Sequence, residues 1–184
     1  MSMKSKKLAM TAAMAALTCL AGMSLHWVSA SVVPFSILPI LALLSGIVLG
    51  AEYGALAMLI YIILGLFGLP VFSTAPFGGF GYVLKPTFGY ILGYPVAAYV
   101  TGKLYRPGSL VWAGIASLGG LAIIYLFGLT YLYVILRWVL DSPTNVAGVL
   151  TMGFLPFISL DLIKAAIAAW VGNEVVRRRL LSQR

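Results

Sequence analysis

The sequence has few charged residues, and acidic residues are especially scarce, with 4 Asp and Glu against 12 Lys and Arg among 184 residues. Charged residues make up 9% of the chain, whereas a soluble domain carries about 25%, so a soluble globular protein is excluded. Cys19 is the only cysteine and His26 the only histidine, which excludes a disulfide framework and a metal site built from several such side chains. The sequence also lacks a phosphate loop and a paired nucleophile and base. We therefore predict neither an enzyme nor a bound cofactor.

Apolar residues are abundant instead, at 62% of the chain, and the mean hydropathy is +1.06. A helix that crosses a bilayer needs about 20 such residues. Six apolar runs cover about residues 8–25, 35–50, 54–69, 86–104, 110–136 and 155–176. We predict an all-α membrane protein, with six transmembrane helices in a compact bundle that forms a single domain over residues 1–184. The run that holds Pro39 is short, which is typical of a transporter binding site or of a helix shielded by its neighbours.

The net charge of +8 lies at the ends of these runs. The basic residues in question are Lys4, Lys6, Lys7, Lys103, Arg106, Arg177, Arg178, Arg179 and Arg184. Basic clusters beside membrane spans stay in the cytoplasm, and six spans place both termini and the Lys103–Arg106 connection on that side. This placement favours contact with the lipid bilayer over a nucleic-acid partner.

Asp161 and Lys164 are opposite charges three residues apart inside the last apolar run. Residues at this spacing share one face of a helix, and charges within a membrane usually face a bundle interior or a water-filled cavity. If the helix begins near Pro156, Asp161 lies about 7–8 Å and Lys164 about 12 Å below its outer end, so the pocket is expected near the extracellular side. The pair can bind a small solute, or it can be an internal ion pair that only neutralises itself.

Two glycine- or alanine-rich patterns have alternative interpretations. The segment 77–87 is rich in glycine and aromatic residues, and it can be a lid over a ligand or an ordinary outer loop. Small residues at four-residue intervals let helices approach closely. One such seam contains Gly89, Gly93, Ala97 and Thr101, and another contains Ala9, Ala12, Ala13 and Ala16. The second seam lies in the first run, where it can either dock a partner helix or pack inside the chain.

Several motifs in this order resemble the BioY family of biotin-specific S components of energy-coupling-factor (ECF) transporters. The similar segments are Val33–Ser36, Leu49–Gly50, Gly54–Ala57, Leu66–Phe72, Gly79–Leu84, Pro86–Thr87, Gly89–Tyr90, Leu155–Phe157 and Asp161–Ala165. The resemblance implies a six-helix prokaryotic plasma-membrane protein that captures biotin from outside and releases it into the cytoplasm. It also implies a monomer that works with a transmembrane coupling subunit, EcfT, and with cytoplasmic ATPases that use the ATP.

The resemblance also assigns roles to residues. Asp161 and Lys164 are expected to hold the polar head of the ligand, with Gly79, Tyr82 and Tyr90 closing over it. Lys85 departs from the family pattern and adds a charge at the pocket mouth, where it can meet a carboxylate. The resemblance implies that Ala9, Ala13 and Ala16 contact the coupling subunit. An S component for a different vitamin, or a membrane assembly protein with a structural ion pair, are the alternatives.

Overall fold

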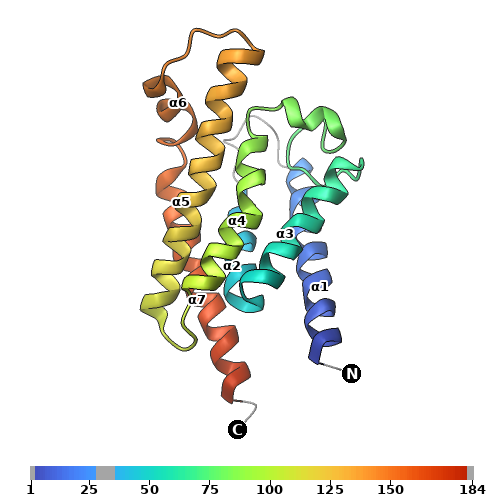
Figure 1. Cartoon of the computed structure of the whole chain (residues 1–184), viewed down its shortest axis with the longest axis vertical. Coiled ribbons are helices and arrows are strands. Elements are labelled where there is room, and N and C mark those ends of the chain that lie inside the picture. The colour runs from blue at the N-terminus through green and yellow to red at the C-terminus, as the bar shows by residue number, and fades with distance from the viewer. Residues whose placement is uncertain (1–2, 28–35, 182–184) are drawn as a thin grey trace.

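The computed structural model describes residues 3–27 and 36–181, and these residues form helices and connections without a β-strand (Figure 1). The motif residues Val33, Pro34 and Phe35 lie outside the described part of the chain. Seven α-helices are present among the described residues: α1 (Met3–Ser24), α2 (Leu38–Leu49), α3 (Ala51–Leu66), α4 (Phe88–Leu104), α5 (Leu110–Val134), α6 (Val146–Gly153) and α7 (Ile158–Leu181). Short helices at Leu25–Trp27 and Phe80–Leu84 and a π-helical turn at Ile135–Val139 complete the elements.

Each of the six predicted apolar runs corresponds to a helix, and α6 is an additional helix that the sequence analysis did not predict. The stretch 141–153 lies between the last two predicted runs, and its residues 146–153 form α6. Only the first part of this stretch is polar, and it ends at Asn145, whose side chain accepts a hydrogen bond of 2.8 Å from the Gly148 amide and caps α6. The axes of α6 and α7 then meet at 55°.

The helices differ in whether they are long enough to cross a membrane. The helices Lys4–Ser24 and Leu110–Val139 are long and apolar enough to cross a membrane, and the bent pair α6–α7 is a third candidate. The shorter apolar helices α2 and α3 have 12 and 16 residues, or about 18 and 24 Å at 1.5 Å per residue. Pro39 does not interrupt α2, because it lies in the first turn, where proline is tolerated.

The predicted seam on α4 packs against α5, which confirms close approach within the chain. A Cβ added to Gly89 would lie 2.2 Å from the Cβ of Tyr131, and one added to Gly93 would lie 3.1 Å from the Cα of Ile124. Further along, the Thr101 hydroxyl donates a buried hydrogen bond of 3.2 Å to the carbonyl of Ala116. This seam fixes the position of the α4 and α5 side chains that line the site described below.

The alanine seam on α1 is not packed inside the chain. Ala9, Ala13 and Ala16 are exposed, whereas Ala15 and Thr18 on another face of the helix are buried. The alternative of an internal seam is therefore wrong for these three residues. Within the described chain, α1 leaves a face of small side chains uncovered.

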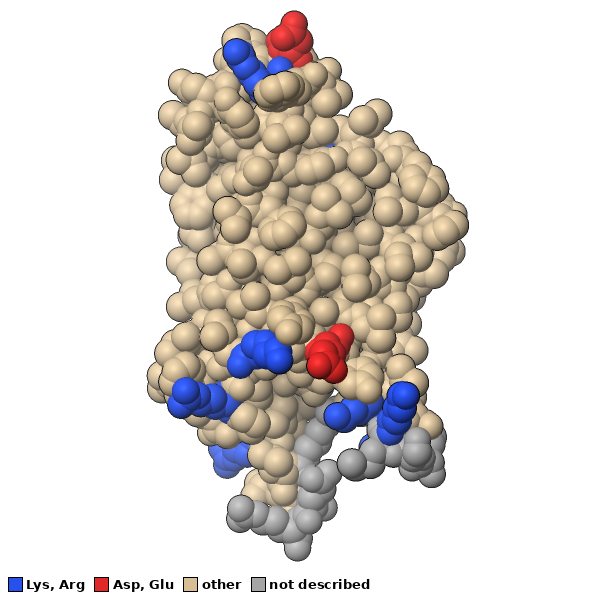
Figure 2. Space-filling view, viewed as in Figure 1, with Lys and Arg blue, Asp and Glu red and all other residues tan. Residues whose placement is uncertain are grey.

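Charged side chains gather at the two ends of the visible surface, with a broad band of uncharged residues between them (Figure 2). Both termini and the connection between α4 and α5 lie at the same end of the molecule (Figure 1). This arrangement agrees with the common side that the basic clusters predict for these three segments.

Candidate functional site

A cavity lies between α2, α4, α5 and α7, and the connection between α3 and α4 forms part of its wall. Its volume is about 120 Å³, which is space for several waters at roughly 10–15 Å³ each or for a small organic group. The lining residues are Ser36, Leu38, Pro39, Ser73, Thr74, Tyr82, Thr87, Tyr90, Ile91, Tyr94, Ile124, Tyr125, Phe157, Asp161 and Lys164. Most of this lining is apolar or aromatic, with one pair of opposite charges.

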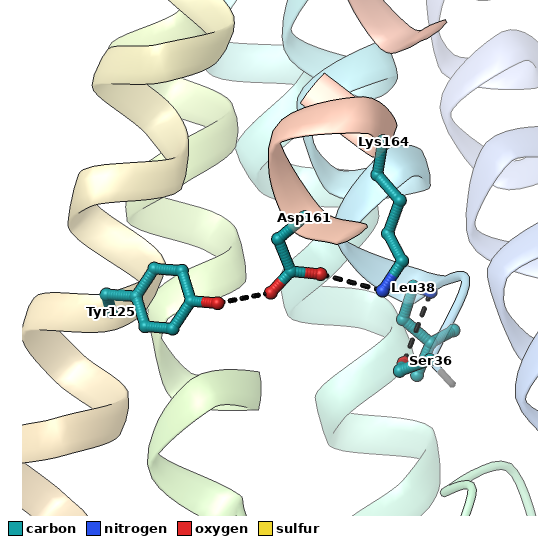
Figure 3. A network of polar contacts seen from close by, with 5 residues as sticks. All are labelled: Ser36, Leu38, Tyr125, Asp161 and Lys164. Carbon is teal, nitrogen blue, oxygen red and sulfur yellow. Dashed lines mark hydrogen bonds and ion pairs between the residues drawn. The ribbon is translucent and has the colours of Figure 1, made fainter. Parts of the chain in front are cut away.

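Asp161 is the centre of the polar network in this cavity (Figure 3). Its Oδ1 accepts a hydrogen bond of 2.7 Å from Lys164 Nζ, and its Oδ2 accepts one of 2.5 Å from the Tyr125 hydroxyl. Asp161 is only 8% exposed. Because α7 begins at Ile158, two residues after Pro156, Asp161 lies in the first helical turn, where the positive end of the helix dipole stabilises a carboxylate.

Toward the residues that the structure describes, the network has unused hydrogen-bonding capacity. A carboxylate has about four acceptor positions, and Asp161 uses two of them with described side chains. An ammonium group has three donors, and Lys164 donates one of them to Asp161. The Lys164 side chain extends toward Ser36 and Leu38 at the start of α2 (Figure 3). The pair can therefore bind N–H groups and oxygen acceptors of a ligand without breaking its own ion pair.

Tyr90 and Tyr125 form an aromatic wall beside this pair. The two rings meet edge to face with centroids 6.1 Å apart. The Tyr90 hydroxyl donates a hydrogen bond of 2.8 Å to the carbonyl of Gly153, and its ring lies on Gly128, where an added Cβ would be 2.2 Å from Tyr90 Cδ1. Gly128 thus gives the Tyr90 ring the space that it occupies.

The connection between α3 and α4 supplies the opposite wall through Ser73, Thr74 and Tyr82. Tyr82 is 1% exposed, and its hydroxyl lies 2.8 Å from the hydroxyl of Thr74. Its ring stacks against Phe72 with centroids 4.3 Å apart. The segment 77–87 therefore contributes Tyr82 and Thr87 to the cavity lining.

Four of the six predicted ligand-binding residues line the cavity: Asp161, Lys164, Tyr82 and Tyr90. Gly79 and Lys85 are not among the lining residues. Gly79 takes a positive φ of 87° and its amide donates to the carbonyl of Gly65, so its role is to turn the backbone. Lys85 is exposed at the end of the short helix Phe80–Leu84.

Sequence reasoning missed several lining residues, above all Tyr125 and Tyr94. Neither belongs to a motif, and the sequence contains 10 tyrosines. The sequence feature that could have indicated these two tyrosines is a nearby glycine on the same helix. Gly93 precedes Tyr94, and Gly128 follows Tyr125 by three residues. Among the described residues, no group of three or more His, Cys, Asp or Glu side chains is placed to hold a metal ion.

Comparison with known proteins decides the family. The sequence model of the BioY family matches residues 1–180. The chain belongs to the BioY family. It is 36% identical to the biotin transporter BioY of Thermotoga maritima over 148 residues, which are 79% of this chain and 83% of the relative. It is also 38% identical to a probable biotin transporter BioY of Pyrococcus horikoshii over 173 residues, which are 94% of this chain and 98% of the relative.

A solved structure extends the BioY likeness to the fold. The crystal structure of the S-component for biotin from an ECF-type ABC transporter matches this chain with a TM-score of 0.68 and 26% sequence identity. The match covers 95% of this chain and 94% of the solved one. The helical arrangement described above is therefore the S-component fold, and BioY family membership makes the protein a component of membrane transport and not an enzyme.

Proposed function

We propose that this protein is the biotin-binding S component of an ECF-type vitamin uptake transporter. The observation that carries the proposal is the cavity in which the buried Asp161 and the half-buried Lys164 face aromatic walls, in a chain of the BioY family. Small-molecule sites combine apolar walls with a few convergent polar groups, and this cavity has both.

Biotin suits the chemistry of this cavity. Its ureido N–H groups can donate to the free acceptor positions of Asp161, and its carbonyl or carboxylate oxygens can accept from Lys164. Its fused rings and alkyl chain need apolar contacts, which Ile91, Ile124 and Phe157 offer along the cavity. The proposed binding set is therefore Asp161, Lys164, Tyr82 and Tyr90 from the sequence, with Tyr125 and Tyr94 added from the structure.

The proposal includes the membrane arrangement. Six spans in a single domain put both termini in the cytoplasm and the cavity near the extracellular side of a prokaryotic plasma membrane. Its support is the common position of the termini and the α4–α5 connection (Figure 1) and the uncharged band between the charged ends (Figure 2). The short helix α2 is surrounded by protein, with 8 of its 12 residues buried, so it does not need the full length of about 30 Å that lipid exposure requires.

The partners are part of the same proposal. The exposed face of Ala9, Ala13 and Ala16 on α1 offers a close-packing surface for the transmembrane coupling subunit. Cytoplasmic ATPases supply the energy, because the sequence has no phosphate loop of its own. The S component itself is proposed to act as one copy within that complex.

The decisive experiment is to purify the protein in detergent, denature it and assay the released material for biotin. Titration of ligand-free protein with biotin, with thiamine and riboflavin as comparison ligands, then gives the affinity. We expect released biotin and saturable one-to-one binding. Tight binding of a different vitamin would reassign the substrate, and a folded protein that binds no small solute would support the structural ion pair instead.

Tyr125→Phe tests the hydroxyl that orients Asp161. We expect biotin affinity to fall about tenfold, because hydrogen bonds to charged groups contribute about 1.5–3 kcal/mol and the substitution keeps the ring. Isothermal titration of the purified variant measures the change. Tyr99→Phe is the matched control, since Tyr99 is an exposed tyrosine of α4 outside the cavity lining. Equal affinities for both variants would remove Tyr125 from the binding set.

A further inference from the structure

The outer end of α1 is attached to the cavity wall by contacts that the proposed binding set does not use. The wall segment is residues 71–77, called here loop 71–77, and its Ser73 and Thr74 line the cavity. His26, just beyond α1, places Nε2 2.6 Å from the carbonyl oxygen of Phe72. A carbonyl oxygen only accepts hydrogen bonds, so Nε2 is the donor.

The His26 ring makes a second contact with the same loop. Its centroid lies 4.0 Å from that of the Phe77 ring, at an interplanar angle of 39°. Phe77 takes a positive φ of 65°, which is costly for a residue with a large side chain and persists only where the surroundings hold it. His26 therefore contacts both ends of the turn that presents Ser73 and Thr74.

Loop 71–77 also has internal hydrogen bonds that make it move as a unit. The Phe72 amide donates to the carbonyl of Phe77, and the Phe77 amide donates to the carbonyl of Thr74, both at 2.8 Å. Thr74 in turn meets the hydroxyl of Tyr82 at 2.8 Å. A displacement of Phe72 or Phe77 therefore also moves the hydroxyl groups of Thr74 and Tyr82, which line the cavity.

Gly22 provides an independent contact one turn earlier on α1. A Cβ built on Gly22 would lie 1.9 Å from the carbonyl oxygen of Val71, so only glycine permits this approach. The same Val71 carbonyl accepts a hydrogen bond of 3.3 Å from the Tyr61 hydroxyl of α3. Gly22 of α1 and His26 just beyond its end, four residues apart, therefore lie against consecutive residues of the loop.

We infer that His26 is a positioning residue, which holds loop 71–77 against α1 and thereby slows the escape of ligand from the cavity. The identity of the ligand rests on the proposed function, whereas the attachment of the loop does not. The inference also makes α1 a mechanical connection between its exposed alanine face and the cavity wall. A displacement of α1 would pull on the wall through His26.

The test measures biotin dissociation from the full-length protein in detergent, by chasing bound labelled biotin with excess unlabelled biotin. His26→Ala loses both contacts, His26→Phe keeps a ring beside Phe77 without a donor, and His26→Gln keeps a donor for the Phe72 carbonyl. We expect dissociation about fivefold faster in His26→Phe, the factor typical of one lost hydrogen bond. His26→Ala should be faster still, and His26→Gln should restore a rate near that of the wild type.

Ser24→Ala is the matched control, because Ser24 is exposed at the same helix end and its hydroxyl donates to the carbonyl of Ala21 within α1. Amide hydrogen exchange of loop 71–77 in ligand-free protein supplies a second readout, and we expect faster exchange in His26→Phe than in Ser24→Ala. If His26 only stabilised the fold, its substitutions would lower the thermal midpoint of unfolding. His26→Phe and His26→Gln would then not differ in biotin dissociation rate or in hydrogen exchange of loop 71–77. If the wild type fails to bind biotin, the proposed function is wrong, and loop exchange alone decides the inference.

An unchanged dissociation rate and unchanged loop exchange in His26→Phe, in a wild-type background that binds biotin, would overturn the inference and leave the proposed function intact. Should His26→Ala fail to fold, the Phe and Gln variants still decide, because both keep a side chain of similar size at this position.

Discussion

Replacing Asp161 with Asn is expected to weaken biotin binding by at least about a hundredfold, or about 2.7 kcal/mol. The carboxylate accepts from Lys164 on one oxygen and from Tyr125 on the other. An amide of the same shape offers one acceptor and one donor, so a donor must face Lys164 or Tyr125. Removing one member of a buried ion pair also leaves the other charge uncompensated, at a cost of about 3–5 kcal/mol. Isothermal titration of the purified variant measures the loss.

Glu174→Gln is the matched control for this loss. Glu174 forms an ion pair with Arg178 at 2.8 Å on the same helix, but both side chains are far more exposed than those of the Asp161–Lys164 pair. Exposed pairs contribute little to stability because solvent screens them, so we expect biotin affinity and thermal midpoint to stay near those of the wild type. A similar loss in both variants would mean that the charge change disturbs α7 in general.

The charge swap Asp161→Lys with Lys164→Asp separates binding from structure. A purely structural pair keeps its attraction after the swap, so the structural hypothesis predicts a folded protein with normal properties. If the pair binds ligand, the swap exchanges the positions of the donor and acceptor groups that the ligand meets. We therefore expect a folded protein without measurable biotin binding. Wild-type affinity in the folded swap variant would assign the pair to helix orientation alone.

The buried face of α7 could be predicted from residue chemistry and helical spacing. Asp161, Ala165 and Ala168 are buried, and Ile163 and Trp170 are exposed, as the pattern of small and polar residues indicates. A strong periodic contrast of this kind needs no knowledge of the neighbouring helices. For this reason Asp161 and Lys164 were the most predictable part of the site.

The opposite wall of the cavity could not be predicted in the same way. Tyr125 and Tyr94 are two of many tyrosines, and their direction depends on how α4 and α5 cross. The approach of Gly93 to Ile124 sets that crossing, and its partner on α5 cannot be found from spacing within α4. The family motif implied that Gly79 contacts the ligand, and the charge of Lys85, a departure from that motif, was expected at the pocket mouth. In the structure Gly79 turns the backbone and Lys85 is exposed, because a sequence pattern does not give the direction of a residue in the fold.

Gly46→Ala is expected to destabilise the fold by about 3 kcal/mol or more, which is the upper range for overpacking of a well-packed core. A Cβ on Gly46 would lie 2.3 Å from the carbonyl oxygen of Ala98 and 3.0 Å from the amide nitrogen of Gly102. Both atoms belong to the backbone of α4, so no rotamer change can relieve the contact. The thermal midpoint in detergent and the fraction of monodisperse protein in size-exclusion chromatography measure the effect.

Gly114→Ala provides the control, because a Cβ at Gly114 would meet nothing within 4 Å. Alanine is favoured over glycine in a helix by about 1 kcal/mol, so this variant should be as stable as the wild type or slightly more stable. Since α4 presents Tyr90 and Tyr94 to the cavity, Gly46→Ala should lose biotin binding together with the fold. Asp161→Asn, in contrast, should lose binding and keep the fold. A Gly46→Ala protein with normal stability would show that α2 and α4 do not cross as closely as the structure places them.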